Sequence, residues 1–198
     1  MKIPVKKERI FRILALEENL TVSELSRKTG LAKSYVSKTL TELKKKNIVW
    51  GTEELHVNYM DLIREWGDFK RDVFRRIKPL VIDMFFPDKI KQIKDYVASG
   101  PFAEMLIQGE SPGRPIIIYL KEKEFAKTEK VLKSFGKTGK GYVFFYAYDG
   151  DVFRNGLKIK GWNIASLPQV CADIIALGTY ADLGIKLFER WLDAGRRV

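Results

Sequence analysis

Hydrophobic residues in the first third of the chain recur every three or four positions, which is the spacing of amphipathic helices. The pattern predicts a helix over residues 7–18, a short helix after Thr21 and a longer helix beyond Gly30. Thr21 and Glu24 stand at the spacing of a capping box, and Gly30 supplies a tight bend. The residues predicted to face inward are Ile10, Ile13 and Leu14 in the first helix, Leu31 at the bend, and Val36, Leu40 and Leu43 in the longer helix.

The longer helix has a polar and basic face opposite its apolar stripe. Hydroxyl and ammonium groups of this kind reach base edges and phosphates in DNA. Residues 21–48 are therefore typical of a DNA-binding helix-turn-helix, and a helical hairpin with a merely solvated outer face is the alternative. The outer face carries Ser34, Lys38, Thr41 and Lys45, and its flank carries Lys33, Tyr35, Ser37 and Lys44.

Two short apolar segments separated by a glycine-containing loop follow the helix-turn-helix. Residues 48–50 and 55–59 each predict a strand, and residues 51–54 form the loop between them. A strand, a loop and a strand after such a helix predict the wing of a winged helix. Glu53 and Glu54 would repel phosphates, so we expect the wing either to stay off the DNA or to touch it through Thr52 and backbone N–H groups.

The pattern beyond the wing predicts a connecting helix and then alternating strands and helices. Residues 115–120 and 142–148 are apolar runs typical of strands buried on both faces, whereas residues 102–107 fit either a strand or a buried helix. The connecting helix covers residues 60–80, and its basic far end either contacts phosphates or is a solvated surface; that end carries Arg71, Arg75, Arg76 and Lys78. The other predicted elements are helices over 88–98, 121–134 (burying Phe125, Val131 and Leu132), 167–177 and 180–194, a turn over 109–113, a weak segment over 153–159 and a strand around 162–164.

The predicted fold class is therefore α+β, with three parts. Residues 1–60 form a winged helix-turn-helix DNA-binding domain, residues 61–80 a connecting helix and residues 81–198 an α/β domain for assembly, sensing or an antitoxin-like role. The formal net charge of +11 suits a polyanionic partner. Residues 1–60 hold twelve Lys and Arg against seven Asp and Glu, so the basic excess per residue is highest where the helix-turn-helix lies.

The scarcity of cysteine and histidine excludes several kinds of site. Cys171 is the only cysteine, so an intramolecular disulfide is impossible and a reducing cytoplasm is expected. With His56 as the only histidine, we expect no zinc finger, no other metal site and no cofactor. We expect Cys171 to be a small buried residue and His56 to be structural. No apolar run approaches the length of a membrane span, and the first residues lack the apolar core of a signal peptide.

Two sequence features resemble catalytic motifs only superficially. Gly136-Lys137-Thr138 matches the end of a phosphate-binding loop, but the required earlier glycine is Val131 and the loop precedes a strand. Asp149 and Asp151 flank a glycine turn, where Asp is favoured for backbone bonding. We therefore predict no catalytic residues and no enzymatic activity.

The residues of the longer helix resemble a known family. Residues 36–43 carry a Val-Ser-Lys-x-Leu-x-x-Leu run similar to that of MarR-like and related winged-helix regulators. Those proteins usually place a capping Ser or Thr just before this helix, where the present chain has Ala32. Alanine cannot accept a bond from the free N–H groups, so this helix start should be weaker by about 1 kcal/mol.

The carboxyl half resembles the C-terminal domain of AbiEi-type antitoxins from type IV toxin–antitoxin loci. The resemblance rests on the strand pattern of residues 118–164 and on a following helix that carries Pro168, Gln169 and Asp173. It implies a transcriptional regulator that acts on its own or a neighbouring promoter. It also implies a genetic partner, a nucleotidyltransferase-like toxin, whose action such a protein opposes without forming a stable complex with it.

Three functions remain open from the sequence. The first is a sequence-specific regulator that binds double-stranded DNA, as a homodimer if its operator is palindromic. The second is a nucleic-acid-processing enzyme delivered by the winged helix, and the third is an adaptor whose winged helix binds a protein. A dimer surface could lie on the connecting helix or on the closing helices.

Overall fold

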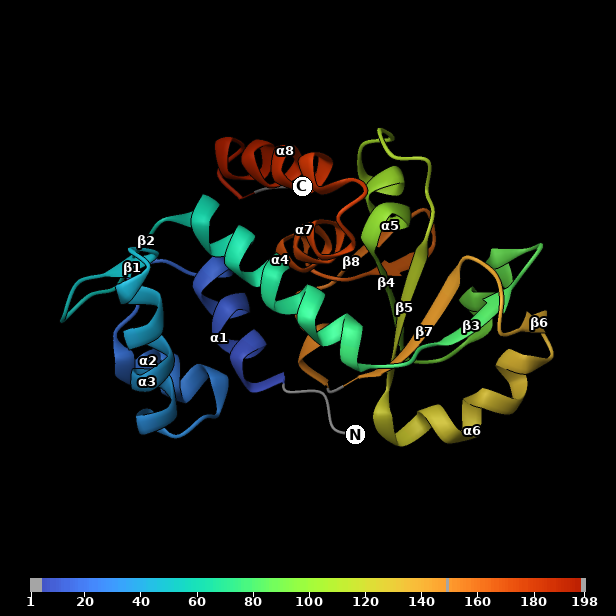
Figure 1. Ribbon diagram of the computed structural model, residues 1–198, viewed down its shortest axis with the longest axis horizontal. Helices are drawn as coiled ribbons and strands as arrows, with labels where there is room; N and C mark the ends of the chain where they lie inside the picture. Colours follow the sequence, from blue (N-terminus) through green and yellow to red (C-terminus); the bar gives the residue numbers. More distant parts are fainter. Residues whose placement is uncertain (1–4, 149, 197–198) are drawn as a thin grey trace.

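Three helices and a two-stranded sheet form the N-terminal part of the computed structural model, which describes residues 5–148 and 150–196 (Figure 1). The capping box is confirmed, because the Thr21 hydroxyl accepts from the Glu24 backbone N–H while the Glu24 carboxylate accepts from that of Thr21. Gly30 ends the second helix with φ +66°, a left-handed conformation that glycine adopts without strain. The elements are α1 (Val5–Leu16), α2 (Val22–Thr29), α3 (Lys33–Lys45), β1 (Val49–Trp50) and β2 (His56–Val57).

The apolar stripe of α3 is confirmed as core. Val36, Leu40 and Leu43 are all buried. No side chain caps the start of α3 at Ala32, also as predicted. The wing strands are shorter than expected, since β1 pairs with β2 only from Val49 to Trp50, and Leu55 instead forms a bridge with Leu20.

A seven-stranded mixed sheet forms the centre of the carboxyl part, with strand order β6-β3-β7-β5-β4-β9-β8. The two predicted apolar strands are confirmed as β5 and β7, which pair in parallel in the middle of the sheet. The only other parallel pair within the described residues joins β4 to β9. The strands are β3 (Leu80–Asp83), β4 (Tyr96–Ser99), β5 (Ile116–Lys121), β6 (Lys137–Thr138), β7 (Val143–Tyr148), β8 (Leu157–Ile159) and β9 (Trp162–Ile164).

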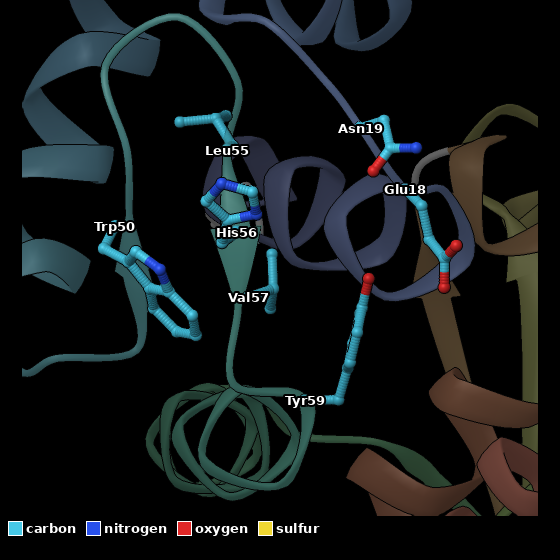
Figure 2. Close-up of a pocket in the computed structure, with 7 residues that line it drawn as sticks. All are labelled: Glu18, Asn19, Trp50, Leu55, His56, Val57 and Tyr59. Atoms are coloured by element: carbon cyan, nitrogen blue, oxygen red, sulfur yellow. The ribbon is translucent and has the colours of Figure 1, made fainter.

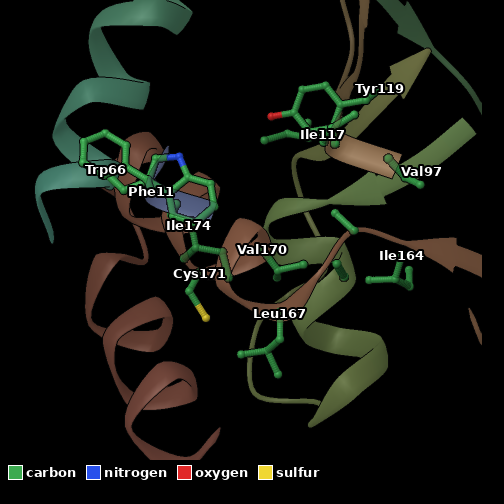
Figure 3. Close-up of a cluster of buried hydrophobic side chains, with 14 of the residues drawn as sticks. Phe11, Trp66, Val97, Ile117, Tyr119, Ile164, Leu167, Val170, Cys171 and Ile174 are labelled. Carbon is green, nitrogen blue, oxygen red and sulfur yellow. The ribbon is translucent and has the colours of Figure 1, made fainter. Parts of the chain in front are cut away.

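Helices pack around this sheet and join it to the N-terminal part. α7 packs on α4, α5 and α8 and also contacts β4. Figure 3 shows side chains of α7, among them Val170, Cys171 and Ile174, between Trp66 of α4 and the strands. The helices are α4 (Tyr59–Arg76), α5 (Gly100–Ile107), α6 (Glu122–Lys133), α7 (Leu167–Leu177) and α8 (Ala181–Asp193), with 3₁₀ turns η1 (Pro87–Gln92) and η2 (Gly150–Phe153).

Some sequence predictions in this part are wrong. Residues 88–98 do not form a helix, because Asp95 takes φ +60° and Tyr96 begins β4, which pairs with β5. The predicted connecting helix ends at Arg76 rather than near residue 80, where β3 starts. Val131 is half exposed instead of buried. Residues 102–107, left open by the sequence, lie in helix α5.

The connecting helix is part of the core rather than a free linker. A Cβ on Gly67 would lie 2.3 Å from a methyl group of Ile175, so α4 and α7 approach too closely for any larger residue there. Buried hydrophobic residues form one cluster that runs from Ile10 of α1 to Trp191 of α8. The N-terminal helices are therefore fixed to the α/β part. No helix within the described ranges is long and apolar enough to cross a membrane.

Candidate DNA-binding surface

The outer face of α3 presents most of the residues that the sequence proposed for DNA contact. The structure leaves Lys38 and Thr41 exposed at the middle of this face, one helical turn apart. Tyr35 and Lys44 are only partly exposed. The exposed members of the predicted set are Lys33, Ser34, Ser37, Lys38, Thr41, Lys45 and, on the wing loop, Thr52.

The lysines of this face differ from neighbouring lysines in their ion pairs. Lys7 lies 3.1 Å from a carboxylate oxygen of Glu42, and Lys46 lies 2.6 Å from one of Glu65. In contrast, the structure gives no ion pair to the ammonium groups of the outer face among the residues that it describes. Their charge is therefore available to an anion without breaking an internal contact. These free lysines are Lys33, Lys38 and Lys45.

The hydroxyl of Thr41 donates to the backbone oxygen of Ser37 at 2.9 Å. This bond fixes the side-chain rotamer and leaves the oxygen free to accept from an outside donor. Tyr35 lies beside α1 at the edge of the surface, with the Lys6 ammonium 5.8 Å from its ring centre. Burial raises the pKa of the Tyr35 phenol, so this group stays a neutral donor and acceptor. Tyr35 can thus reach a ligand only from the rim of the face.

The wing is tied to the end of α3 by Lys44. Its ammonium donates to the carbonyl of Gly51, where the wing loop begins. A Cβ at Gly51 would lie 2.0 Å from the carbonyl oxygen of Glu54, so this tight loop requires glycine. Lys44 therefore positions the wing and is less free for phosphate contact than the other predicted lysines. Glu53 and Glu54 are exposed beside Thr52, as the sequence suggested.

Trp50 is a surface residue that the sequence analysis did not select. Its side chain is 52% exposed, and its ring centre lies 5.9 Å from that of His56 on the paired strand. Figure 2 shows both rings on the wing, beside a hollow of about 260 Å³ that Glu18, Asn19 and Tyr59 also line. The alternation of β1, with Val49 inside and Trp50 outside, was the signal that could have revealed it.

A network of buried polar groups joins α1 to the α/β part. The Lys70 ammonium lies 2.9 Å from Oε1 of Glu8 and donates to the Tyr148 hydroxyl at 2.7 Å, while that hydroxyl donates to Glu8. The Lys70 ammonium also lies 3.6 Å from Oδ1 of Asp173. Glu8 and Lys70 are fully buried, so this charge is closed to solvent.

Asp173 continues this network at the centre of the α/β part. Its carboxylate accepts from the Ser99 hydroxyl at 2.6 Å, the Tyr119 hydroxyl at 2.9 Å and the Gln169 amide at 2.9 Å. The Gln169 carbonyl in turn accepts from the Arg12 guanidinium of α1 at 2.5 Å. Burial raises the pKa of Asp173, while the nearby Lys70 ammonium lowers it. The groups hold two parts of the chain together and are too enclosed to meet a substrate.

The structure also places the other residues that the sequence singled out for possible chemistry. Asp151 lies 2.9 Å from the Arg9 guanidinium, and its neighbour Asp149 falls outside the described residues. Cys171 is buried, as predicted, and burial raises the pKa of its thiol. Gly136 lies against the backbone of β3, where a Cβ would meet the carbonyl of Asp83 at 2.0 Å. His56 is exposed and packs on Trp50. Within residues 5–148 and 150–196, no cluster of three His, Cys, Asp or Glu could hold a metal ion.

Comparison with known proteins bears on the N-terminal part. Residues 6–49 match the family model described as winged helix-turn-helix DNA-binding, from α1 to the first wing strand. No curated protein and no solved structure matches the chain. The family match names a class of domain and neither the MarR-like regulators nor the AbiEi-type antitoxins. The N-terminal part of this chain is thus a winged helix-turn-helix DNA-binding domain, followed by a helix and a mixed α/β domain.

Proposed function

We propose that this chain is a sequence-specific transcriptional regulator that reads double-stranded DNA with α3. The observation that carries the proposal is the outer face of α3, where exposed hydroxyls lie among ammonium groups that form no ion pair with any residue that the structure describes. Such a face can place Lys38 and Thr41 against base edges and Lys33 and Lys45 against phosphates. The wing, held by Lys44, flanks this surface.

A double substitution tests this assignment. Lys38→Ala with Thr41→Ala should weaken operator binding by about 1–3 kcal/mol if the pair contacts bases. The matched control is Lys123→Ala with Thr128→Ala on α6, because Thr128 makes the same hydroxyl bond to a preceding carbonyl, that of Glu124 at 2.9 Å. Fluorescence anisotropy on operator fragments selected from random sequence gives both affinities. Equal affinity of folded wild type and double variant would remove α3 from the interface.

Salt dependence separates this function from that of a protein adaptor. Phosphate neutralisation makes the logarithm of the binding constant fall linearly with the logarithm of the salt concentration. A titration of the full chain from low to high salt should therefore show a steep negative slope. A palindromic operator would bind two copies, which sedimentation of the complex would reveal.

The finer proposal is that the chain regulates its own or a neighbouring promoter as the antitoxin of a type IV pair. The order of the two parts and the Pro168-x-x-x-x-Asp173 helix support it by resemblance. In the structure, Gln169 and Asp173 bond to one another inside the buried network, so they serve the fold rather than a toxin surface. Co-expression with the adjacent gene provides the test: growth arrest that this chain relieves supports the proposal, and a harmless neighbour contradicts it.

We further propose that the α/β domain is non-catalytic. Of the acidic pair that the sequence offered, Asp151 is paired to Arg9, and the buried Asp173 elsewhere in the domain is enclosed by hydroxyl and amide donors. Purified protein should neither cleave nor transfer nucleotides with magnesium or manganese present. Turnover that disappears in Asp151→Asn or Asp149→Asn would contradict this proposal and favour an enzyme.

A further inference from the structure

Two phenylalanines stand exposed at the end of the molecule farthest from α3. Phe85 is 87% exposed and Phe86 is 63% exposed, and only Met84 separates them from the end of β3. Their ring centres lie 4.9 Å apart with the planes at 76°. Figure 1 shows this loop beyond β3 at one end of the long axis, with α3 at the other. Adjacent apolar rings left open to water in this way mark an interaction surface.

The backbone of several lysines lies close to the segment that carries the two rings. In the antiparallel pairing of β6 with β3, the backbone of Lys137 lies opposite that of Asp83, two residues before Phe85. The backbone N–H of Lys89 donates to the carbonyl of Phe86 at 3.3 Å. Lys140 precedes Gly141, and a Cβ added to that glycine would lie 2.5 Å from the backbone of Asp83. Among the residues that the structure covers, the ammonium groups of Lys89, Lys137 and Lys140 form no ion pair.

Gly136, the glycine of the Gly-Lys-Thr sequence, and Gly141 together explain how these lysines are presented. Gly136 and Gly141 both lie flat on the backbone of β3, closer than any side chain would allow. The hairpin backbone therefore packs against β3, and the side chains of Lys137 and Lys140 are left exposed. A further cation, Arg114, lies 3.9 Å from the ring centre of Tyr142, whose hydroxyl donates to the carbonyl of Met84.

We propose that this aromatic-basic tip, formed by Phe85, Phe86, Lys89, Lys137 and Lys140, binds single-stranded nucleic acid. Exposed rings offer faces on which unpaired bases stack, and the free ammonium groups neutralise the neighbouring phosphates. Bases in a duplex are already stacked on one another, so the tip selects unpaired strands. Because it lies opposite α3, it binds without displacing an operator, and this inference does not depend on the proposed function.

The test uses the full chain with Lys38→Ala and Thr41→Ala, which removes the candidate base contacts of α3. Fluorescence anisotropy with a labelled 15-nucleotide oligo-dT, and separately with oligo-U, measures affinity. Phe85→Ala with Phe86→Ala should weaken binding at least tenfold, because each stacked base contributes about 1–3 kcal/mol. The matched control is Val131→Ala, which trims a half-exposed apolar side chain of α6 that cannot stack. Phe86→Tyr keeps a ring and should retain affinity.

The lysines are tested by the salt dependence of the same binding. Lys137→Ala with Lys140→Ala should reduce the slope of log affinity against log salt by about 0.7 for each lost phosphate contact. Lys123→Ala with Lys186→Ala, which changes two exposed lysines elsewhere, should leave the slope unchanged.

Unchanged oligonucleotide affinity in a folded protein that carries Phe85→Ala with Phe86→Ala overturns the proposal. The proposal is also overturned if Phe85 and Phe86 are needed for binding to vesicles of neutral and anionic phospholipid but not for binding to oligonucleotides. Phe85→Ala with Phe86→Ala in the otherwise unaltered chain should leave operator binding at the wild-type level.

Discussion

Two regions of this molecule are rich in charged and hydroxyl groups, and they use them in opposite ways. On the outer face of α3, Lys38 and Thr41 are exposed and the ammonium group has no ion pair within the described chain. In the network between α1, α4 and α7, Lys70 and Asp173 are fully buried and each contacts several polar partners. The comparison shows that exposure, rather than residue type, decides whether a charge can serve a ligand or must serve the fold.

The energetic reason is desolvation. An exposed lysine keeps its water, so its removal changes stability little and its charge remains available to a phosphate. A buried ion has lost its water, and its partners must replace that solvation. The network of Glu8, Lys70 and Asp173 therefore fixes α1, and with it the winged helix, against the α/β part.

The largest effect that would test this comparison is the loss of Lys70. Lys70→Met keeps a long unbranched side chain but leaves Glu8 and Asp173 buried without their cation. It should lower the free energy of unfolding by about 3–5 kcal/mol. The matched exposed change, Lys38→Met, should stay within about 0.5 kcal/mol of wild type. Urea denaturation measures both. Equal stability of the two variants would show that the buried network contributes nothing specific.

A second prediction concerns the two faces of α3 itself. Leu40 is 2% exposed, so Leu40→Ala should destabilise the protein by about 2–5 kcal/mol through lost burial and the cavity left behind. The neighbouring Thr41→Ala removes an exposed hydroxyl and should leave stability nearly unchanged. A Leu40→Ala protein with wild-type melting but no DNA binding would mean that the faces are reversed.

The third prediction is a pH dependence that only the buried region should show. Burial raises the pKa of Asp173 in the folded state, so the native protein holds this proton more tightly than the unfolded chain does. The resulting stability is complete below the unfolded pKa of about 3.9 and is lost as the pH rises through the folded value. Lys70, Glu8, Ser99, Tyr119 and Gln169 are the groups that face this carboxyl.

Asp173→Asn removes that titration. The free energy of unfolding of wild type, relative to the variant, should therefore fall as the pH rises above about 4 and then become level. Urea titrations between pH 3 and 8 give the two curves. Parallel curves across this range would show that Asp173 ionises in the folded protein as it does in the unfolded chain.

The two regions also differ in how far the sequence could predict them. The α3 face follows from helical periodicity, which is local, so Val36, Leu40 and Leu43 were placed in the core correctly. The network joins Glu8 to Tyr148 and Lys70 to Asp173, across more than a hundred residues, and no local pattern records such a contact. Tyr96 shows the same limit, because pairing with β5 overrides the helical pattern of residues 88–98. The exposure of Phe85 and Phe86 likewise has no local signal in the sequence, because nothing in an apolar residue's identity records that it will lie in solvent.

The smallest effect concerns the start of α3, where the backbone of Ala32 has φ −57° and ψ 137° and no side chain caps the first turn. Ala32→Ser supplies a hydroxyl that can accept from those N–H groups, so it should stabilise the protein by about 1 kcal/mol. Thr21→Ala is the reciprocal control, since it removes the existing cap of α2 and should cost a similar amount. Thermal melting of the two variants measures both changes. A melting temperature for Ala32→Ser equal to or below that of wild type would mean that the first turn of α3 is already satisfied by solvent.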